Sequence, residues 1–362
     1  NPHTGRLLHH LTRAEEWDDV RRLLEAAPDG SFNMEYVSFY DTLLENLGAE
    51  DHDARTHALF HKCTILFKNG NSERADSILK QILMLAISYR LPGAAANAYH
   101  ILTAYNAKSY ALEKAYFCGR KALYYYEQLA DTLRARRNVL KLLSQAELLR
   151  NRREASSALV AELDELTEAG DSERISAYAE RAVLMSAYGE AMRILEPVLE
   201  DDSPELEDYR LGHLYLALMA SWFACDFEHV VAVSRLLFRG KHRHYGYRAQ
   251  AIAQAAGARA LMGYTEDVTS RIKQAEFEFY QIRNDFDRVD ALRTIAEVCL
   301  IVGDPEKAEQ LAREGLTIGL RHSAYFPTFT LLMLLVEIRW RREDLTSVRY
   351  FLDEASFLVE HD

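Results

Sequence analysis

The chain has 362 residues, 49% of them hydrophobic, and its 43 lysine and arginine residues against 55 aspartate and glutamate residues give a formal net charge of −12 at pH 7. A chain of this length exceeds the size at which a single hydrophobic core keeps growing, so we expect either several domains or a linear array of repeats. The acidic balance disfavours nucleic-acid binding by the chain as a whole, because phosphate recognition needs a net cationic surface.

Residues 1–53 form the first predicted segment. The stretch HHLTRAEEWDDVRRLLEAA, residues 9–27, has apolar residues at helical spacing, and we expect a helix pair here with Val20 as its reference residue. Proline, glycine and acidic residues interrupt this periodicity over residues 28–53, which predicts an extra helix or a distorted unit. Because the chain begins at Asn1 inside a helical pattern, we expect it to be a piece of a longer polypeptide.

From residue 54 onward one short pattern recurs. In VGDPEKAEQLAREGL, Gly303 ends one helix, Asp304 can cap the next, and Pro305 occupies its first position. Apolar residues then follow at helical spacing from Ala308. This interval predicts a continuous array of helix pairs over residues 54–362. Equivalent positions recur every 36 to 40 residues, at Ala75, Ala115, Ala155, Ala191, Val230, Val268, Ala308 and Val348.

Each repeat also carries a matching position on its first helix. A small or aliphatic residue at this position lets the first and second helices of a pair approach closely. The matching residues, each twelve positions before its reference, are Cys63, Thr103, Leu143, Ala179, Leu218, Ala256, Ala296 and Val336.

The repeat resembles the tetratricopeptide repeat (TPR), whose usual period is about 34 residues. The resemblance lies in the Gly-Asp turn, in the alanine of the second turn of the second helix, and in the small residue where the two helices cross. The period of 36 to 40 residues in this chain implies longer helices. The resemblance implies an all-α fold, a right-handed superhelical solenoid of about nine antiparallel helix pairs. Long, degenerate repeats of this kind are similar to the sensor and scaffold regions of bacterial signal-transducing ATPases and of LuxR-type transcription activators similar to the maltose regulator.

The four cysteines lie far apart in apolar helical stretches and form no metal-binding pair. We interpret Cys63, Cys118, Cys225 and Cys299 as reduced core thiols, which predicts a reducing, cytoplasmic location. No apolar run approaches the roughly 20 residues that a membrane span needs, so we expect no membrane association.

The sequence contains none of the common motifs for nucleotide binding, nucleophilic catalysis or zinc proteolysis. We therefore expect no catalytic residue, no cofactor and no metal site. His242 and His244 belong to a basic, aromatic loop over residues 239–248, and a second basic stretch covers residues 134–153. Neither has a docking motif beside it, so we expect no specific nucleic-acid binding.

If the array is a superhelix, the first helix of each pair lines its concave face, and positions 8, 11, 15 and 18 before each reference residue face the groove. The aromatic and pairable polar groups at these positions suit partner recognition. Tyr215, Met219 and Trp222 form the largest cluster, although burial against a neighbouring repeat would explain them equally well. Arg137 and Arg293 are candidates for binding an anionic group. The remaining candidates are His57, Phe60, Asn97, His100 and Trp340, with Glu147, Gln250, Glu297 and Glu337 at equivalent positions.

Two kinds of function remain open at this point. The first is a non-catalytic domain that binds a protein, a peptide or a small ligand, within a larger signalling or transcription-regulatory protein. Its partner could include other domains of the same polypeptide. The second is a structural scaffold that gathers subunits of a multiprotein assembly.

Overall fold

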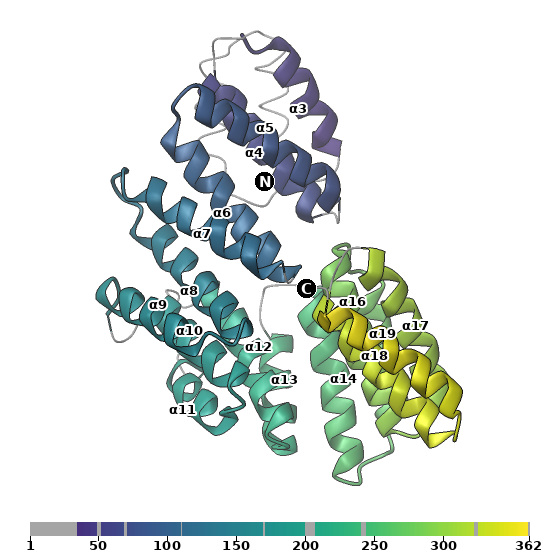
Figure 1. Cartoon of the computed structure of the whole chain (residues 1–362). Coiled ribbons are helices and arrows are strands. Elements are labelled where there is room, and N and C mark those ends of the chain that lie inside the picture. Colours follow the sequence, from purple (N-terminus) through teal and green to yellow (C-terminus); the bar gives the residue numbers. More distant parts are fainter. Residues whose placement is uncertain are drawn as a thin grey trace. The chain divides into compact units, whose positions relative to one another are not determined.

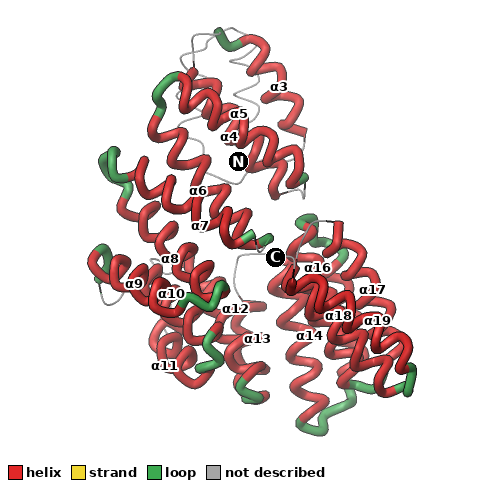
Figure 2. Tube along the Cα trace, viewed as in Figure 1, coloured by secondary structure: helices red, strands yellow, loops and turns green. Residues whose placement is uncertain are grey.

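The computed structural model describes residues 35–48, 52–68, 71–109, 111–168, 171–199, 207–239, 244–321 and 325–360. Within these ranges the regular structure is entirely helical, as Figures 1 and 2 show. The predicted helix pair over residues 9–27 and His242 lie outside the described residues. The helices are α3 (Glu35–Asn46), α4 (His52–Lys68), α5 (Ser72–Ser88), α6 (Pro92–Lys108), α7 (Leu112–Tyr126), α8 (Leu133–Leu149), α9 (Arg153–Glu165), α10 (Ser172–Leu184), α11 (Tyr188–Leu199), α12 (Glu207–Phe223), α13 (Phe227–Arg239), α14 (Tyr245–Leu261), α15 (Val268–Phe279), α16 (Asp285–Ile301), α17 (Pro305–Arg321), α18 (Tyr325–Arg341) and α19 (Leu345–Glu360).

Adjacent helices pack as pairs, among them α4 with α5, α10 with α11, α12 with α13, α14 with α15, α16 with α17 and α18 with α19. The predicted all-α solenoid of helix pairs is therefore confirmed. Every reference residue of the repeat lies on the second helix of its pair, and all are buried except Ala155, where Ser156 takes the buried position instead. Their partners on the first helices are buried too, apart from Val336, which is half-buried. The interval of 36 to 40 residues in the sequence is therefore the distance along the chain from the contact inside one helix pair to the same contact in the next pair.

A left-handed residue closes the turn inside most pairs. Gly303 has φ 85°, and the N–H of Asp304 donates to the carbonyl of Cys299 at 2.9 Å, the pattern by which a glycine ends a helix. Oδ1 of Asp304 then accepts from the N–H of Lys307 at 3.1 Å and caps α17. Equivalent turns place left-handed residues at Asn151, Ser186, Cys225, Gly263 and Glu343. Glycine is thus the best residue for this turn, but the repeat also accepts others.

Small residues let the first helices pack closely. Residues 249–258 of α14 are all buried, and seven of these ten are alanine or glycine. A Cβ atom on Gly257 would come within 3.0 Å of both Trp222 of α12 and Val298 of α16. The three helices α12, α14 and α16 therefore meet where a larger side chain would not fit.

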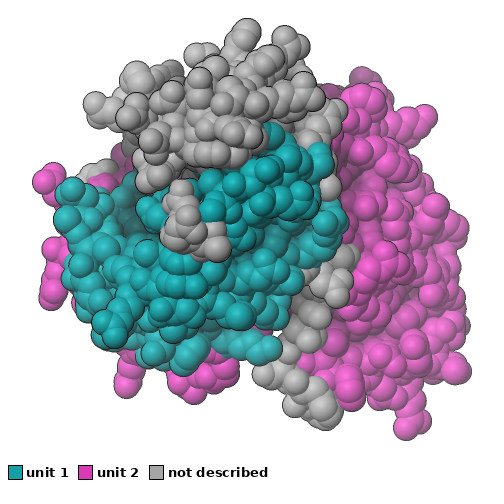
Figure 3. All heavy atoms as spheres, turned by 90° about the horizontal axis from the view of Figure 1, so that it is seen from above, with its two compact units in different colours: residues 1–105, 114–139 teal, residues 106–113, 140–362 magenta. Residues whose placement is uncertain are grey.

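The chain divides into two compact units, coloured in Figure 3. Unit 1 comprises residues 1–105 and 114–139, and unit 2 comprises residues 106–113 and 140–362. This division runs through α6 and α8 and does not fall between residues 53 and 54. The continuity of one array over residues 54–362 stays a prediction. The extra helix expected within residues 28–53 is present as α3, whose Tyr40 and Leu43 are fully buried.

The cysteines require one correction. All four are free thiols, and Cys63, Cys118 and Cys299 are buried as expected, but Cys225 is exposed. Cys225 is the left-handed residue of the turn between α12 and α13, with φ 57°, so the end of the helix carries its side chain out of the core. Among the described helices, none is both long and apolar enough to cross a membrane.

Candidate functional site

The ten main groove candidates fall into three sets by the pocket that they line. Four of them, His57, Phe60, Asn97 and His100, line a pocket in unit 1. Tyr215, Met219 and Arg293 line a second pocket, in unit 2. Arg137, Trp222 and Trp340 line neither.

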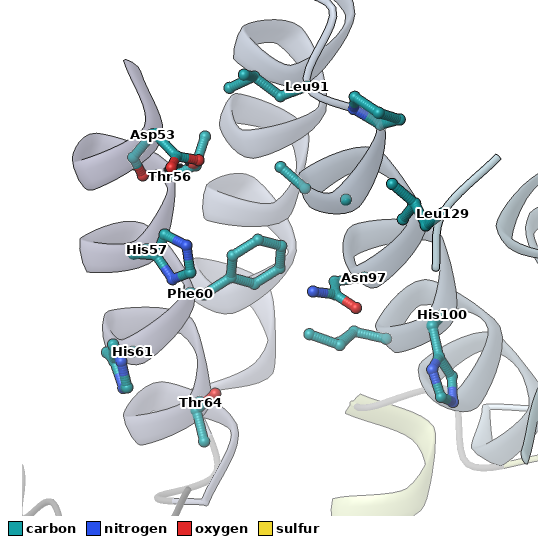
Figure 4. Close-up of a pocket in the computed structure, with 14 residues that line it drawn as sticks. Asp53, Thr56, His57, Phe60, His61, Thr64, Leu91, Asn97, His100 and Leu129 are labelled. Atoms are coloured by element: carbon teal, nitrogen blue, oxygen red, sulfur yellow. Dashed lines mark hydrogen bonds between the residues drawn. The ribbon is translucent and has the colours of Figure 1, made fainter. Parts of the chain in front are cut away.

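The pocket in unit 1 has a volume of about 740 Å³ and lies between the first helices α4 and α6. Figure 4 shows His57 and Phe60 of α4 directed toward Asn97 of α6. These side chains share one face of each helix because residues three or four apart lie one turn apart. The full lining is Asp53, Thr56, His57, Phe60, His61, Thr64, Leu91, Pro92, Gly93, Ala94, Asn97, His100, Ile101 and Leu129.

A hydrogen-bonded relay orients two of the polar groups. The hydroxyl of Tyr126, on α7, donates to Oδ1 of Asn97 at 2.8 Å and lies 3.1 Å from Nδ1 of His100. Because the single hydroxyl proton is used on Asn97, Nδ1 of His100 must carry a proton and donate to Tyr126. The relay therefore leaves the Nδ2 donors of Asn97 and the acceptor Nε2 of His100 for a ligand.

Burial keeps this relay uncharged at neutral pH. It lowers the pKa of His100 to about 4, and it raises the pKa of Tyr126 to about 12. Both groups are therefore neutral across the physiological range, so the relay acts through hydrogen-bond direction and not through charge.

The pocket leaves further hydrogen-bonding capacity open. The ring of His57 and the hydroxyl of Thr64 have no hydrogen bond to any described residue, and both are only half-buried. Asp53 is the one carboxylate among the lining residues, and no lysine or arginine lines the pocket. The pocket thus combines uncharged donors and acceptors with the apolar surfaces of Phe60 and its neighbours.

The first turn of α6 forms part of the same wall. Pro92, Gly93 and Ala94 line the pocket, and the first N–H groups of a helix have no acceptor within that helix. α6 carries no acidic residue in this turn. A carbonyl or carboxylate oxygen of a ligand would be favoured there.

Sequence reasoning missed Tyr126, because the groove positions were counted on first helices and Tyr126 belongs to a second helix. It also missed Leu129, in the loop after α7. The run of three tyrosines at residues 124–126 was the available signal. Of these, Tyr124 is exposed while Tyr126 is 3% exposed, so the run itself does not tell which one turns inward.

The groove assignment of Trp222 needs correction, because its side chain is 7% exposed and lies in the core of unit 2. Its ring packs over Gly257 and meets Phe227 edge to face, with the ring centroids 6.2 Å apart. Trp340, in contrast, is 64% exposed near the end of α18, and Arg137 is half-buried on α8. The position counted from the repeat therefore gives different environments in different repeats.

The second pocket, of about 360 Å³, lies within unit 2. Tyr215 and Met219 of α12 and Arg293 of α16 contribute to its wall. The part of the chain that the structure describes holds no cluster of three or more histidine, cysteine, aspartate or glutamate side chains suited to a metal ion.

A scan against protein-family models finds no match, and a search among curated proteins also finds none. Among solved structures, the chain is similar to a Rap protein complexed with competence and sporulation factor. The TM-score is 0.63 at 12% sequence identity, and the alignment covers 99% of this chain and 97% of the Rap chain. The TPR domain of P58(IPK) aligns over 99% of this chain and 98% of that chain at 16% identity, but with a TM-score of 0.24. The similarity to the Rap protein supports a TPR-like helical-repeat fold.

Proposed function

We propose that this chain is a non-catalytic recognition domain that binds a peptide segment in the pocket of unit 1. The observation that carries the proposal is the set of open hydrogen-bonding groups on α4 and α6 beside an apolar surface. Nδ2 of Asn97 donates and Nε2 of His100 accepts, one turn apart. A peptide unit offers one acceptor and one donor, so it matches this pair without needing a charge.

The shape of the pocket supports an extended ligand. Its volume of about 740 Å³ lies in the range of roughly 300–1,000 Å³ typical of ligand pockets. Phe60, Leu91 and Leu129 offer apolar surface for ligand side chains, and a TPR-like solenoid exposes such a surface on its first helices. The Rap structure with the same fold is itself a complex, with competence and sporulation factor, which fits a ligand-binding use of the fold.

The wider role follows from the resemblance noted in the sequence. We propose that the domain acts in the cytoplasm as the sensor part of a signalling or transcription-regulatory protein, with other domains of that protein as further partners. A scaffold role would instead use the outer surface of the second helices. Exposed apolar residues occur there, such as Phe117 at 58% and Tyr280 at 75%.

Selection from a displayed library of random heptapeptides tests the proposal. We expect the selection to enrich peptides that bind the wild-type chain. These peptides should lose at least about tenfold in affinity with Phe60→Ala or Asn97→Ala, since a side chain that the ligand covers as an anchor contributes about 2 kcal/mol. Phe117→Ala, on the outer surface of α7, is the matched control and should leave the affinity unchanged. Peptides that depend on Phe117 and not on Phe60 or Asn97 would favour the scaffold role and contradict the proposed site.

A further inference from the structure

The pocket of unit 2 differs in chemistry from the pocket of unit 1. Its wall includes three carboxylates, Glu180 of α10 and Asp287 and Asp290 of α16, among mainly apolar side chains. Its volume of about 360 Å³ suits one small group or one side chain of a larger ligand. The question is whether the protein itself neutralises these carboxylates.

The protein's own cations form only long ion pairs with two of these carboxylates. Nζ of Lys141 lies 3.7 Å from Oε1 of Glu180, and Nε of Arg293 lies 3.7 Å from Oδ1 of Asp290. A direct ammonium or guanidinium contact to a carboxylate is about 2.7–2.9 Å long. The buried Oε2 of Glu180 has no hydrogen-bond partner among the described residues, and neither has the buried Nε of Arg293.

Arg293 does not make the pocket a site for anions. Its Nη1 lies 3.6 Å from Glu297 and its Nε faces Asp290, so its charge is directed to two carboxylates of its own helix. Lys108, the other cation of the wall, is exposed to solvent. Burial outweighs the attraction of these cations and raises the pKa of both Glu180 and Asp290. Partly buried carboxylates of this kind gain free energy from a cation that enters the pocket.

A rigid aromatic wall stands beside the carboxylates. The ring of Tyr215 stacks on Tyr247 with 4.1 Å between centroids, and Tyr247 stacks on His244 at 4.0 Å. The hydroxyl of Tyr215 donates to Oε1 of Gln250 at 3.0 Å, which fixes the ring. An aromatic face attracts a cation, and Leu216 and Met219 continue the wall with apolar surface.

We propose that this pocket binds a primary ammonium group carried on an apolar chain, with Glu180 and Asp290 as its counter-charges and Tyr215 beside it. Such a group occurs at the amino terminus of a peptide that begins with an apolar residue, and at the end of a lysine side chain. The site is separate from the pocket of unit 1, so either can fail without the other.

The experiment uses the full chain and three small probes. Leucinamide carries an α-ammonium, Nα-acetyl-lysinamide carries a side-chain ammonium, and N-acetyl-leucinamide carries neither. We expect at least one ammonium probe to bind about tenfold or more tightly than N-acetyl-leucinamide, as measured by saturation-transfer NMR titration. The tighter of the two ammonium probes identifies the amino terminus or the lysine side chain as the natural source.

Two variants and a control assign the binding to the pocket. Glu180→Gln and Asp290→Asn keep the side-chain shape and should each weaken the ammonium probe about tenfold. Glu196→Gln, an exposed carboxylate of α11, should leave it unchanged. Equal binding of all three probes, no binding of the ammonium probes, or unchanged binding in both pocket variants would overturn the proposal. The probe comparison uses the wild-type chain, so it decides the question even if a variant is unstable.

Discussion

The hydroxyl of Tyr126 donates a 2.8 Å hydrogen bond to Oδ1 of Asn97, so a residue of a second helix orients a polar group that faces the pocket between first helices. Tyr126→Phe removes this bond and leaves both Asn97 Oδ1 and His100 Nδ1 without it. We expect the affinity for a pocket-binding peptide to fall about tenfold and the free energy of unfolding to fall by about 1 kcal/mol.

Tyr125→Phe is the matched control for that variant. The Tyr125 ring stacks on Tyr99 with 6.0 Å between centroids, but its hydroxyl has no hydrogen bond to any described residue. Peptide affinity, measured by isothermal titration calorimetry, should therefore stay at the wild-type value. Equal losses in the two variants would show that the relay does not orient Asn97.

His100 predicts a specific dependence of stability on pH. Its pKa is about 4 in the folded chain, below the ordinary value of 6.5, because burial disfavours the charged ring. The unfolded chain therefore binds the proton first as the pH falls, so this contribution is complete above pH 6.5 and is lost between pH 6.5 and about 4. The loss should be between about 1 and 3 kcal/mol.

Urea unfolding of the wild-type chain and of His100→Gln, measured at several values between pH 7 and pH 4.5, checks this dependence. The glutamine variant cannot take up the proton, so its unfolding free energy should fall less over this range. Parallel curves for the two proteins would rule out His100 as a source of acid sensitivity.

The two tryptophans of first helices α12 and α18 should behave in opposite ways. Trp222 is 7% exposed and packs over Gly257, so Trp222→Ala should cost about 3–5 kcal/mol of unfolding free energy. Trp340 is 64% exposed, so Trp340→Ala should change the free energy of unfolding by less than about 0.5 kcal/mol. Circular dichroism during urea unfolding measures both, and a stable Trp222→Ala protein would restore Trp222 as a groove residue.

The left-handed turns give a further pair of variants. Glu343 has φ 60°, a conformation that costs a residue with a Cβ about 1–2 kcal/mol, so Glu343→Gly should raise the unfolding free energy by up to about 1 kcal/mol. Gly303→Ala imposes the same strain at φ 85° and should lower the free energy of unfolding by about 1 kcal/mol. Changes of the same sign in the two thermal unfolding experiments would contradict this account of the turn.

The repeat could be predicted from the sequence because its contacts are local and periodic. The reference residues from Ala75 to Val348 mark where the second helix of each pair meets the first, and all of them except Ala155 are buried. Asn97 and His57 followed from the same counting. The position of Tyr126 could not be predicted from the repeat, because its role depends on which side of α7 faces α6.

Trp222 shows a second limit of the pattern. Its position is equivalent to a groove residue, but the absence of a side chain at Gly257 lets the indole of α12 pack closely against α14. Similarly, the predicted group shares Tyr215, Met219 and Arg293 with the lining of the second pocket, whereas Glu180 and Asp290 were not singled out. Their significance comes from burial and from the distance to the nearest cation, and neither quantity is visible in a sequence.

The measurement that tests the proposed recognition site most directly is an NMR titration of the ¹⁵N-histidine-labelled chain with a peptide selected from the heptapeptide library. His57 and His100 line the pocket of unit 1, while His213 is 1% exposed in unit 2 and lies 2.9 Å from the hydroxyl of Ser176. We predict that the ring nitrogens of His57 and His100 shift on peptide binding and that those of His213 do not. A saturating peptide that leaves His57 and His100 unchanged would contradict the account.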